Sequence, residues 1–322
     1  MRRVPALALV LTLLVAQGAC TAGPAAPPIS PSAGGWRRLA DAPSERTEVA
    51  AAATDKGLIA VVGGFVASGF TVSTVEILDT ATGRWRRGPD LPVKVNHAMA
   101  AARGADILVV GGYLDSQEPS AAAYRFDGTR WSALAPMPAG RAAGTAVALD
   151  GALYVAGGIG PDGLAAEMFV YDLAGDRWST APGPPTRREH LGGAGFGGLV
   201  YTVGGRAGGQ SAILGAFEAY DPRTRVWTRL PDLPTPRGGL AAAATCSGLV
   251  VAVGGEARAA FEEAEAFDTR SGTWSSLPPM PTPRHGLGVV AVGATLYTLA
   301  GGPRPGLHVS AATEAIDLGA CA

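Results

Sequence analysis

Residues 153–158 read Leu-Tyr-Val-Ala-Gly-Gly, an apolar run that ends in a glycine doublet. The same arrangement recurs along the chain, with doublets that begin at Gly63, Gly111, Gly157, Gly204, Gly254 and Gly301. The intervals between successive doublets are 48, 46, 47, 50 and 47 residues. A constant interval of this size indicates a structural repeat built from short strands.

The six tryptophans keep the same interval as the glycine doublets. Successive tryptophans are 49, 46, 47, 49 and 47 residues apart, at Trp36, Trp85, Trp131, Trp178, Trp227 and Trp274. An Ala/Gly-rich segment such as residues 240–245 precedes each apolar run. Between the doublet and the next tryptophan lies a segment that ends in aspartate, as in Val170-Tyr171-Asp172. Each repeat is therefore predicted to contain four short strands, the content of one propeller blade.

With these doublets, aspartate-ended strands and tryptophan strands, the chain resembles the kelch-repeat family from residue 36 to about residue 318. The resemblance implies an all-β, six-bladed propeller over residues 36–322. Trp36 precedes the first complete set of strands, and the last set, residues 284–318, has three strands and no tryptophan. We therefore expect the strand at residues 36–39 to become the outer strand of the last blade. Closure of this kind removes a sheet edge.

The composition agrees with short strands joined by tight turns. Of 322 residues, 46 are glycine and 25 are proline, and 47% are apolar, which is enough for a large core. The 26 Lys and Arg residues balance the 27 Asp and Glu residues. Binding of nucleic acid requires a surplus of positive charge to neutralise phosphates. The charge balance therefore argues against a nucleic-acid partner.

The N-terminus, residues 1–20, is predicted to be a secretory signal. Arg2 and Arg3 precede an uncharged run over residues 4–16. This run of 13 residues is shorter than the roughly 20 residues that cross a bilayer as a helix. The pattern therefore predicts an exported protein and disfavours a membrane-spanning anchor.

The end of the signal, Gly18-Ala19-Cys20, resembles the lipobox of bacterial lipoproteins, which implies that Cys20 becomes the lipidated mature N-terminus. Gln17 departs from the leucine usual in that family, and the alternative is cleavage after Gly18 with free secretion. Residues 21–35 are rich in proline and small residues and are predicted to form an extended tether. We expect either a cell-envelope lipoprotein, attached to the membrane by its lipid only, or a secreted protein.

One face of the predicted propeller carries the longer loops. The loops after the doublets differ most among the repeats, at residues 65–73, 113–122, 206–215 and 303–312. The opposite face carries short hairpin turns such as Asp150-Gly151. Loops that vary on a common scaffold commonly carry recognition, so we predict that the long-loop face binds the partner. The alternative is that these loops are only solvated connections.

An arginine begins the innermost strand of five repeats. Ten residues after the tryptophan stand Arg46, Arg141, Arg188, Arg237 and Arg284, with Val95 in the remaining repeat. We expect these arginines to ring one mouth of the central channel. Guanidinium groups bind carboxylates, sulfates and acidic sugars through paired hydrogen bonds. This hypothesis assigns the five arginines to ligand binding.

Histidine and glutamate recur beside the arginines. Two positions further along are Glu48, His97 and His190, and His285 directly follows Arg284. We include His97 and His190 in the predicted ligand site. In the alternative interpretation each arginine pairs within the scaffold, with an acidic group or with loop carbonyls. Glutamates recur three residues before the strand-ending aspartate, at Glu76, Glu218, Glu265 and Glu314.

Two cysteines remain besides Cys20, at Cys246 and Cys321. Cys246 lies at the inner hairpin turn of the fifth repeat, and Cys321 follows the third strand of the sixth, which places both toward the short-turn face. In an exported protein two remaining cysteines allow a disulfide between Cys246 and Cys321. The alternative is a buried thiol and a frayed terminus.

Two classes of enzyme are built on propellers of the kind that this sequence resembles. Proteins similar to galactose oxidase hold copper with two histidines and two tyrosines, but only Tyr113 of the seven tyrosines here lies in a loop after a doublet. A copper enzyme is therefore not favoured, and we expect no metal or other cofactor. Bacterial sialic acid (N-acetylneuraminate) mutarotases act through a glutamate and an arginine. Candidates by that resemblance are Glu189 with Arg188 and Glu256 with Arg258.

The sequence favours a monomeric binding or interaction module over either enzyme. No phosphate-binding loop, catalytic triad spacing or His/Cys metal cluster is evident in the sequence. The expected partner is a protein or an acidic glycan, bound at the long-loop face. The mutarotase and the copper oxidase remain as alternatives.

Overall fold

The computed structural model describes Met1 and residues 34–321. Apart from Met1, the predicted signal with Cys20 lies outside the described residues, as does the tether up to residue 33. The predictions made for those segments therefore stay predictions. All regular elements in the described part are β-strands. No helix there is long and apolar enough to cross a membrane.

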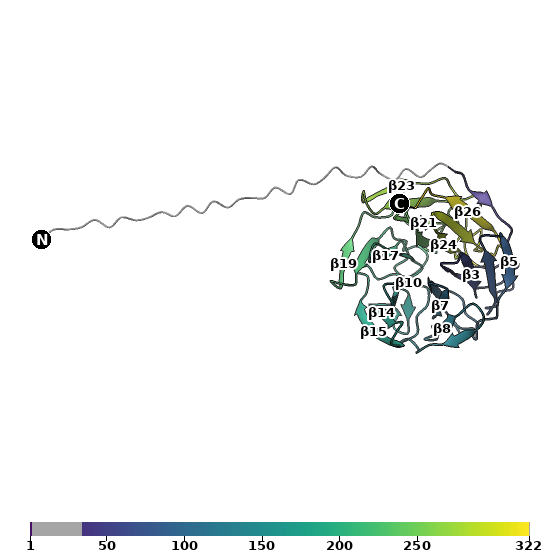
Figure 1. Ribbon diagram of the computed structural model, residues 1–322, viewed down its shortest axis with the longest axis horizontal. Helices are drawn as coiled ribbons and strands as arrows, with labels where there is room; N and C mark the ends of the chain where they lie inside the picture. Colours follow the sequence, from purple (N-terminus) through teal and green to yellow (C-terminus); the bar gives the residue numbers. More distant parts are fainter. Residues whose placement is uncertain (2–33, 322) are drawn as a thin grey trace.

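Six four-stranded antiparallel sheets are arranged around a central axis as the blades of a propeller (Figure 1). Blade one contains β2 (Ala50–Ala53), β3 (Leu58–Val62), β4 (Val75–Asp79) and β5 (Arg84–Arg87). Blade two contains β6 (Met99–Arg103), β7 (Asp106–Val110), β8 (Ala123–Phe126) and β9 (Trp131–Ala133). Blade three contains β10 (Thr145–Leu149), β11 (Ala152–Ala156), β14 (Glu167–Asp172) and β15 (Arg177–Pro182).

The second half of the ring repeats this order. Blade four contains β16 (Gly192–Phe196), β17 (Leu199–Val203), β18 (Phe217–Asp221) and β19 (Val226–Arg229). Blade five contains β20 (Ala241–Ala244), β21 (Leu249–Val253), β22 (Ala264–Asp268) and β23 (Thr273–Ser276). Blade six contains β24 (Gly288–Val292), β25 (Thr295–Leu299), β26 (Thr313–Asp317) and β1 (Arg37–Arg38). A short hairpin in a loop of blade three, β12 (Ile159–Gly160) with β13 (Gly163–Leu164), completes the set. The predicted all-β, six-bladed propeller is confirmed.

The N-terminal strand closes the ring, as the strand count predicted. β1 pairs with β26, with Arg37 opposite Ala315 and Arg38 opposite Glu314. The indole N–H of Trp36 donates to the carbonyl of Pro278 at 2.7 Å, across to blade five. The last blade is therefore built from both ends of the described chain.

The innermost strands are made of small residues because they crowd around the channel. Each innermost strand contacts those of both neighbouring blades. β2 and β20 consist of alanine, and β16 includes Gly193. A Cβ atom at Gly193 would lie 2.3 Å from the hydroxyl of Thr145 in the adjacent blade. Larger side chains on these strands would force the blades apart.

The tryptophans link neighbouring blades through their indole N–H groups. Each indole is half-buried and donates to a backbone carbonyl near the outer edge of the preceding blade. The pairs are Trp36 with Pro278, Trp85 with Ala40, Trp131 with Pro89, Trp178 with Ala135, Trp227 with Pro182 and Trp274 with Pro231. One residue per repeat thus contributes both apolar surface and a directional contact.

The glycine doublets join the blades near the centre. In blades one to five the N–H of the second glycine donates to the carbonyl at the arginine position of the next blade, as in Gly64 to Val95, and in blade six the first glycine, Gly301, donates to Arg46. In blade six the doublet is displaced by one residue. Ala300, with φ of +54°, takes the position that Gly63 holds in blade one, and both donate to the same place on the third strand. Alanine accepts this left-handed backbone at a cost of roughly 1–2 kcal/mol.

A disulfide joins Cys246 and Cys321, whose Cα atoms are 5.2 Å apart. It fastens the segment after β26 to the inner hairpin of blade five.

Candidate functional site

The recurrent arginines lie inside the blades and not at the channel mouth, which corrects the expected position. Four of them are fully buried and pair with the glutamates on the third strands of their own blades. The ion pairs are Arg46–Glu76 at 2.8 Å, Arg188–Glu218 at 2.6 Å, Arg237–Glu265 at 2.5 Å and Arg284–Glu314 at 2.6 Å. Burial lowers the pKa of each guanidinium, and the paired glutamate opposes that shift.

The fifth arginine is satisfied differently. Arg141 donates to the carbonyls of Gly157 and Glu167, and its guanidinium lies 4.2 Å from the ring centre of Phe169. Phe169 stands where blades one, four, five and six have the paired glutamate. The physical reason for these inward positions is that the guanidinium satisfies carbonyl groups where the doublet and third strand diverge. The five arginines therefore play no part in the ligand contacts proposed below.

A ring of six residues surrounds the channel mouth, two positions after the arginine position of each blade. We call this the mouth ring; it comprises Glu48, His97, Ala143, His190, Gly239 and Gly286. Around the ring, the N–H of each of the last five donates to the carbonyl of the member before it, as from His97 to Glu48 at 3.0 Å. All six residues have positive φ, between +51° and +66°.

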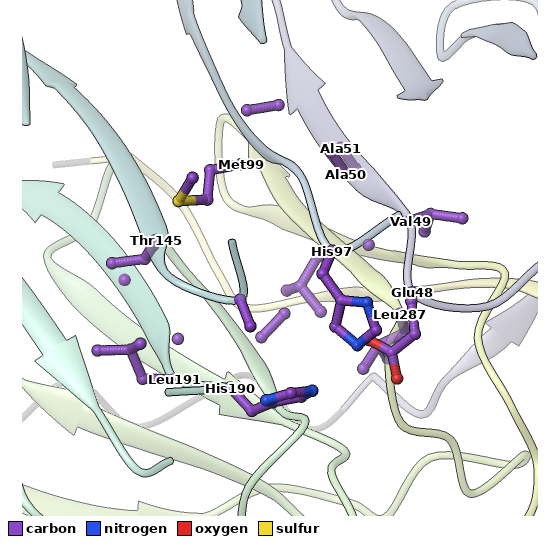
Figure 2. Close-up of a pocket in the computed structure, with 18 of the residues that line it drawn as sticks. Glu48, Val49, Ala50, Ala51, His97, Met99, Thr145, His190, Leu191 and Leu287 are labelled. Carbon is purple, nitrogen blue, oxygen red and sulfur yellow. The ribbon is translucent and has the colours of Figure 1, made fainter. Parts of the chain in front are cut away.

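Three members of the mouth ring have ionisable side chains although their positive φ angles are unfavourable for residues other than glycine. Gly239 and Gly286 adopt positive φ at little cost. Glu48, His97 and His190 bear a cost of roughly 1–2 kcal/mol each. Their side chains point toward one another at the channel mouth (Figure 2). Such conformations cluster at functional sites, so the mouth is the candidate site.

A pocket of about 370 Å³ opens above the mouth ring on the long-loop face. Three members of the mouth ring line it, together with residues just before ring members, residues just after glycine doublets, and parts of the loops of blades four and six. The side chains that carry charge or a titratable ring are Glu48, His97, Glu189, His190, Arg206, Glu256 and His285. His97 and His190 thus lie at the predicted mouth, whereas the arginines predicted beside them do not.

Arg206 connects two carboxylates across the pocket. Its guanidinium lies 3.1 Å from Glu256 and 3.5 Å from Glu189. All three side chains are almost completely buried. The one guanidinium thus bridges the two carboxylates.

His285 is held as a cation. Its Nδ1 lies 3.2 Å from Glu48 Oε1, and its Nε2 lies 3.0 Å from the Arg304 carbonyl and 3.1 Å from the Gly306 carbonyl. Both ring nitrogens face acceptors, so both must carry protons. Burial alone would lower the pKa of His285, but the hydrogen bond and charge of Glu48 raise it above its ordinary value.

The two other histidines of the pocket are in a different state. Burial lowers the pKa of both His97 and His190 below the ordinary value, which keeps the rings neutral near pH 7. Burial would raise the pKa of Glu48, but the histidines around it, among them the hydrogen-bonded His285, lower it below the ordinary value. The pocket therefore combines a carboxylate with two neutral imidazoles.

The pairs suggested by resemblance to mutarotases are not brought together. Glu189 faces the pocket beside Arg206, whereas Arg188 is buried against Glu218. Glu256 also pairs with Arg206, and Arg258 is exposed. For Arg188 and Glu189 the separation arises because adjacent residues on an extended segment point to opposite sides. Neither predicted glutamate–arginine pair forms a catalytic unit.

The residues needed for a copper site like that of galactose oxidase are not assembled in residues 34–321. Tyr113 packs edge-on against His97, with ring centres 5.6 Å apart. Cys246 and Cys321 are joined in the disulfide, so neither is free to cross-link a tyrosine. The structure of residues 34–321 thus gives no support to a radical-copper site.

Arg206 was missed by the sequence analysis, although a signal for it existed. Its position directly follows a doublet in blades one to five, at Phe65, Tyr113, Ile159, Arg206 and Glu256, and the equivalent residue in blade six, where the doublet is displaced by one, is Gly302. Each forms an isolated β-bridge with the residue just before a mouth-ring member, as between Arg206 and Glu189. Alignment of the doublets would have placed these side chains in one circle at the mouth.

Comparison with known families matches most of the propeller. The family model described as the KLHDC2/KLHL20/DRC7 Kelch-repeats domain matches residues 48–232, more than half of the chain. A second family model, the Kelch motif, matches residues 237–281.

Curated relatives are similar over part of the chain. Kelch-like protein terF of Aspergillus terreus is 28% identical over 202 residues, which are 58% of this chain and 44% of that protein. Kelch-like protein 35 of Mus musculus is 28% identical over 184 residues, 56% of this chain and 29% of that protein. Kelch repeat and BTB domain-containing protein 13 of Homo sapiens is 33% identical over 141 residues, 43% of this chain and 29% of that protein. The matches thus span less than half the length of these relatives.

Proposed function

The chain belongs to the kelch-repeat family, and from this premise we propose that it is an extracytoplasmic, lipid-anchored propeller that binds a protein partner with its long-loop face. The family membership supports an interaction module. The pocket and the longest loops lie on the same face, which supports that face as the binding surface.

The observation that carries the proposal is an exposed apolar pair beside the pocket. Phe70 is 71% exposed and Leu307 is 47% exposed, on the loops that follow the doublets of blades one and six. These loops touch, because a Cβ atom at Gly69 would lie 3.1 Å from a methyl group of Leu307. In residues 34–321 the remaining large exposed apolar side chain is Val226, on the outer strand of blade four. An apolar pair of this kind next to a polar pocket is typical of a protein-binding surface.

The charged groups that line the pocket indicate which kind of partner side chain it binds. Glu48, Glu189 and Glu256 outnumber the cationic groups Arg206 and His285. With the recurrent arginines buried, the pocket offers no cluster of free guanidinium groups for an acidic glycan. A polar or basic side chain of a protein partner fits the pocket, while Phe70 and Leu307 contact apolar surface around it.

Two features support the extracytoplasmic location. The sequence at residues 1–20 has the pattern of a signal that ends in a lipobox. The Cys246–Cys321 disulfide suits an oxidising compartment. The tether at residues 21–35 would separate the propeller from the membrane.

Affinity capture with matched variants tests the proposed binding face. Immobilised wild-type protein is exposed to envelope and surface proteins of the source cells, beside a Phe70→Ser/Leu307→Ser variant and a Val226→Ser control. We expect a partner that the wild type and the control retain and the double variant loses, because interface anchors contribute about 2 kcal/mol or more each. Equal retention by the control and the double variant would show that the partner binds elsewhere.

A further inference from the structure

Three side chains from three different blades meet at the mouth ring (Figure 2). Glu48, His97 and His190 each offer one donor atom, and these atoms all lie within 4.8 Å of one another. The distance from His97 Nε2 to Glu48 Oε2 is 3.2 Å. A tetrahedral ion with ligands at about 2.1 Å separates its donor atoms by roughly 3.4 Å. The glutamate and the first histidine already have this spacing.

The neighbours of His97 determine which of its nitrogens has a free lone pair. Nδ1 lies 2.6 Å from the side-chain oxygen of Asn96. The Asn96 amide nitrogen faces the Thr71 hydroxyl at 3.0 Å and the Tyr113 carbonyl at 3.5 Å, which orients its oxygen toward His97. An amide oxygen only accepts hydrogen bonds, so the Nδ1 of His97 carries the proton.

This tautomer creates a contact that requires a cation. The lone pair of His97 Nε2 faces the carboxylate oxygen of Glu48 at 3.2 Å, and two acceptors at this distance repel each other. A metal ion between them would convert the repulsion into two bonds. The alternative is a second proton on the His97 ring.

His190 has the same kind of support as His97. Its Nδ1 contacts the Glu189 carboxylate, whose other oxygen lies 3.5 Å from Arg206. The Nε2 of His190 is therefore the nitrogen left for a ligand. Histidines that bind metals usually donate their other N–H to a carboxylate or carbonyl, which fixes the ring and raises its basicity.

Glu48 is oriented from its other oxygen. Oε1 faces Nδ1 of His285 at 3.2 Å, and this leaves Oε2 directed at His97. The carboxylate thus has one oxygen for a structural contact and one for a ligand.

From these contacts we propose that Glu48, His97 and His190 bind a divalent transition-metal ion of the zinc type, with a coordination position open to the pocket. Two imidazoles and one carboxylate suit Zn²⁺ and similar first-row ions better than Mg²⁺ or Ca²⁺, which prefer oxygen ligands. The sequence analysis expected no metal, because the three residues are 49 and 93 positions apart. The site does not depend on the protein partner proposed above.

Titration of the purified protein with Zn²⁺, followed by calorimetry, tests the proposal. We expect one ion per chain for the wild type. His97→Ala, His190→Ala and Glu48→Gln should each weaken binding by more than about 100-fold, since loss of an outer-shell partner alone costs about 10- to 100-fold. Alanine already occupies the same ring position at Ala143, with the same positive φ, so the histidine variants are expected to fold.

Two further variants separate the site from general histidine binding. His308 is exposed and lies outside the mouth ring, so His308→Ala should keep the wild-type affinity. Asn96→Ala removes the partner of His97 Nδ1 and should weaken Zn²⁺ binding by about 10- to 100-fold.

A measurement on the wild-type protein guards against variants that do not fold. The NMR signals of the His97 and His190 ring protons should move when Zn²⁺ is added, while the His308 signals stay in place. No binding by the wild type, equal binding by the His97→Ala variant, or movement of the His308 signals alone would each overturn the proposal. A proton shared within the Glu48–His97 pair would then explain the contact.

Discussion

Arg237 shows how a single repeated side chain holds a blade together. Its Nε donates to the Gly254 carbonyl at 2.6 Å, and one terminal nitrogen pairs with Glu265 at 2.5 Å while donating to the Thr235 carbonyl at 2.7 Å. Blade two has neither partner, because Val95 and Tyr124 stand at the two positions. Every blade that has the glutamate also has the arginine, because the buried carboxylate would otherwise lack a partner.

The pair in blade five is expected to behave as a unit. Arg237→Ala should lower the free energy of unfolding by about 3–5 kcal/mol, because it leaves a buried carboxylate unpaired. The double variant Arg237→Val/Glu265→Tyr, which copies blade two, should lose less than that single variant. Urea denaturation monitored by tryptophan fluorescence measures both. If the double variant lowers the free energy of unfolding by as much as the single variants Arg237→Val and Glu265→Tyr added together, the two residues do not act as a coupled pair.

At the scale of elements, β1 is the shortest strand of its blade and the one that closes the ring. The segment around it makes contacts on both sides. Leu39 donates to the Thr313 carbonyl at 2.9 Å within blade six, and the Ala40 carbonyl accepts the indole N–H of Trp85 from blade one at 2.9 Å. Loss of this segment would expose the edge of β26.

Deletion of residues 36–40 should therefore lower the melting temperature by at least about 5 °C, from the loss of several hydrogen bonds at about 1 kcal/mol each. Deletion of residues 21–33 in the same background is the control and should leave it unchanged. Differential scanning calorimetry gives both values. Equal melting temperatures for the two deletions would contradict closure by β1.

At the scale of the whole molecule, three sets of contacts run around the ring. Tryptophan indoles link the rims, the doublets link the blades near the centre, and the mouth ring links the residues at the channel. Charged pairs buried inside the blades leave the mouth to Glu48, His97 and His190. The long-loop face is therefore a rigid frame around one pocket, with variable loops above it.

The proposed attachment to a membrane concerns the molecule as a whole. Replacement of Cys20 by Ala should move the protein from the membrane fraction to the medium or the soluble envelope fraction. The variant would lose the lipid chain, whose burial in the membrane stabilises attachment by about 0.8 kcal/mol per CH₂ group. Fractionation and immunoblotting measure the shift. Intact-mass analysis should find a lipidated Cys20 in the wild type. An unmodified N-terminus at another residue would refute the anchor.

The sequence by itself determined the propeller, its six blades and its closure. The constant interval between glycine doublets and between tryptophans indicates which segments are equivalent. Equivalent four-stranded units can bury their faces only by stacking side by side. The missing fourth strand after residue 284 then required Trp36 and its neighbours to complete the last blade. These conclusions depend on spacing along the chain, which is visible without coordinates.

Only the tertiary structure decided which repeated side chains face the channel. The repeat placed Arg188, Glu189 and His190 near one mouth, but the direction of each side chain depends on a local backbone that turns left-handed at His190. As a result Arg188 points into its blade, while Glu189 and His190 face the pocket. Glu48, His97 and His190 likewise meet because three blades direct them to the same point on the channel axis. The spacing of these residues along the chain does not reveal this proximity.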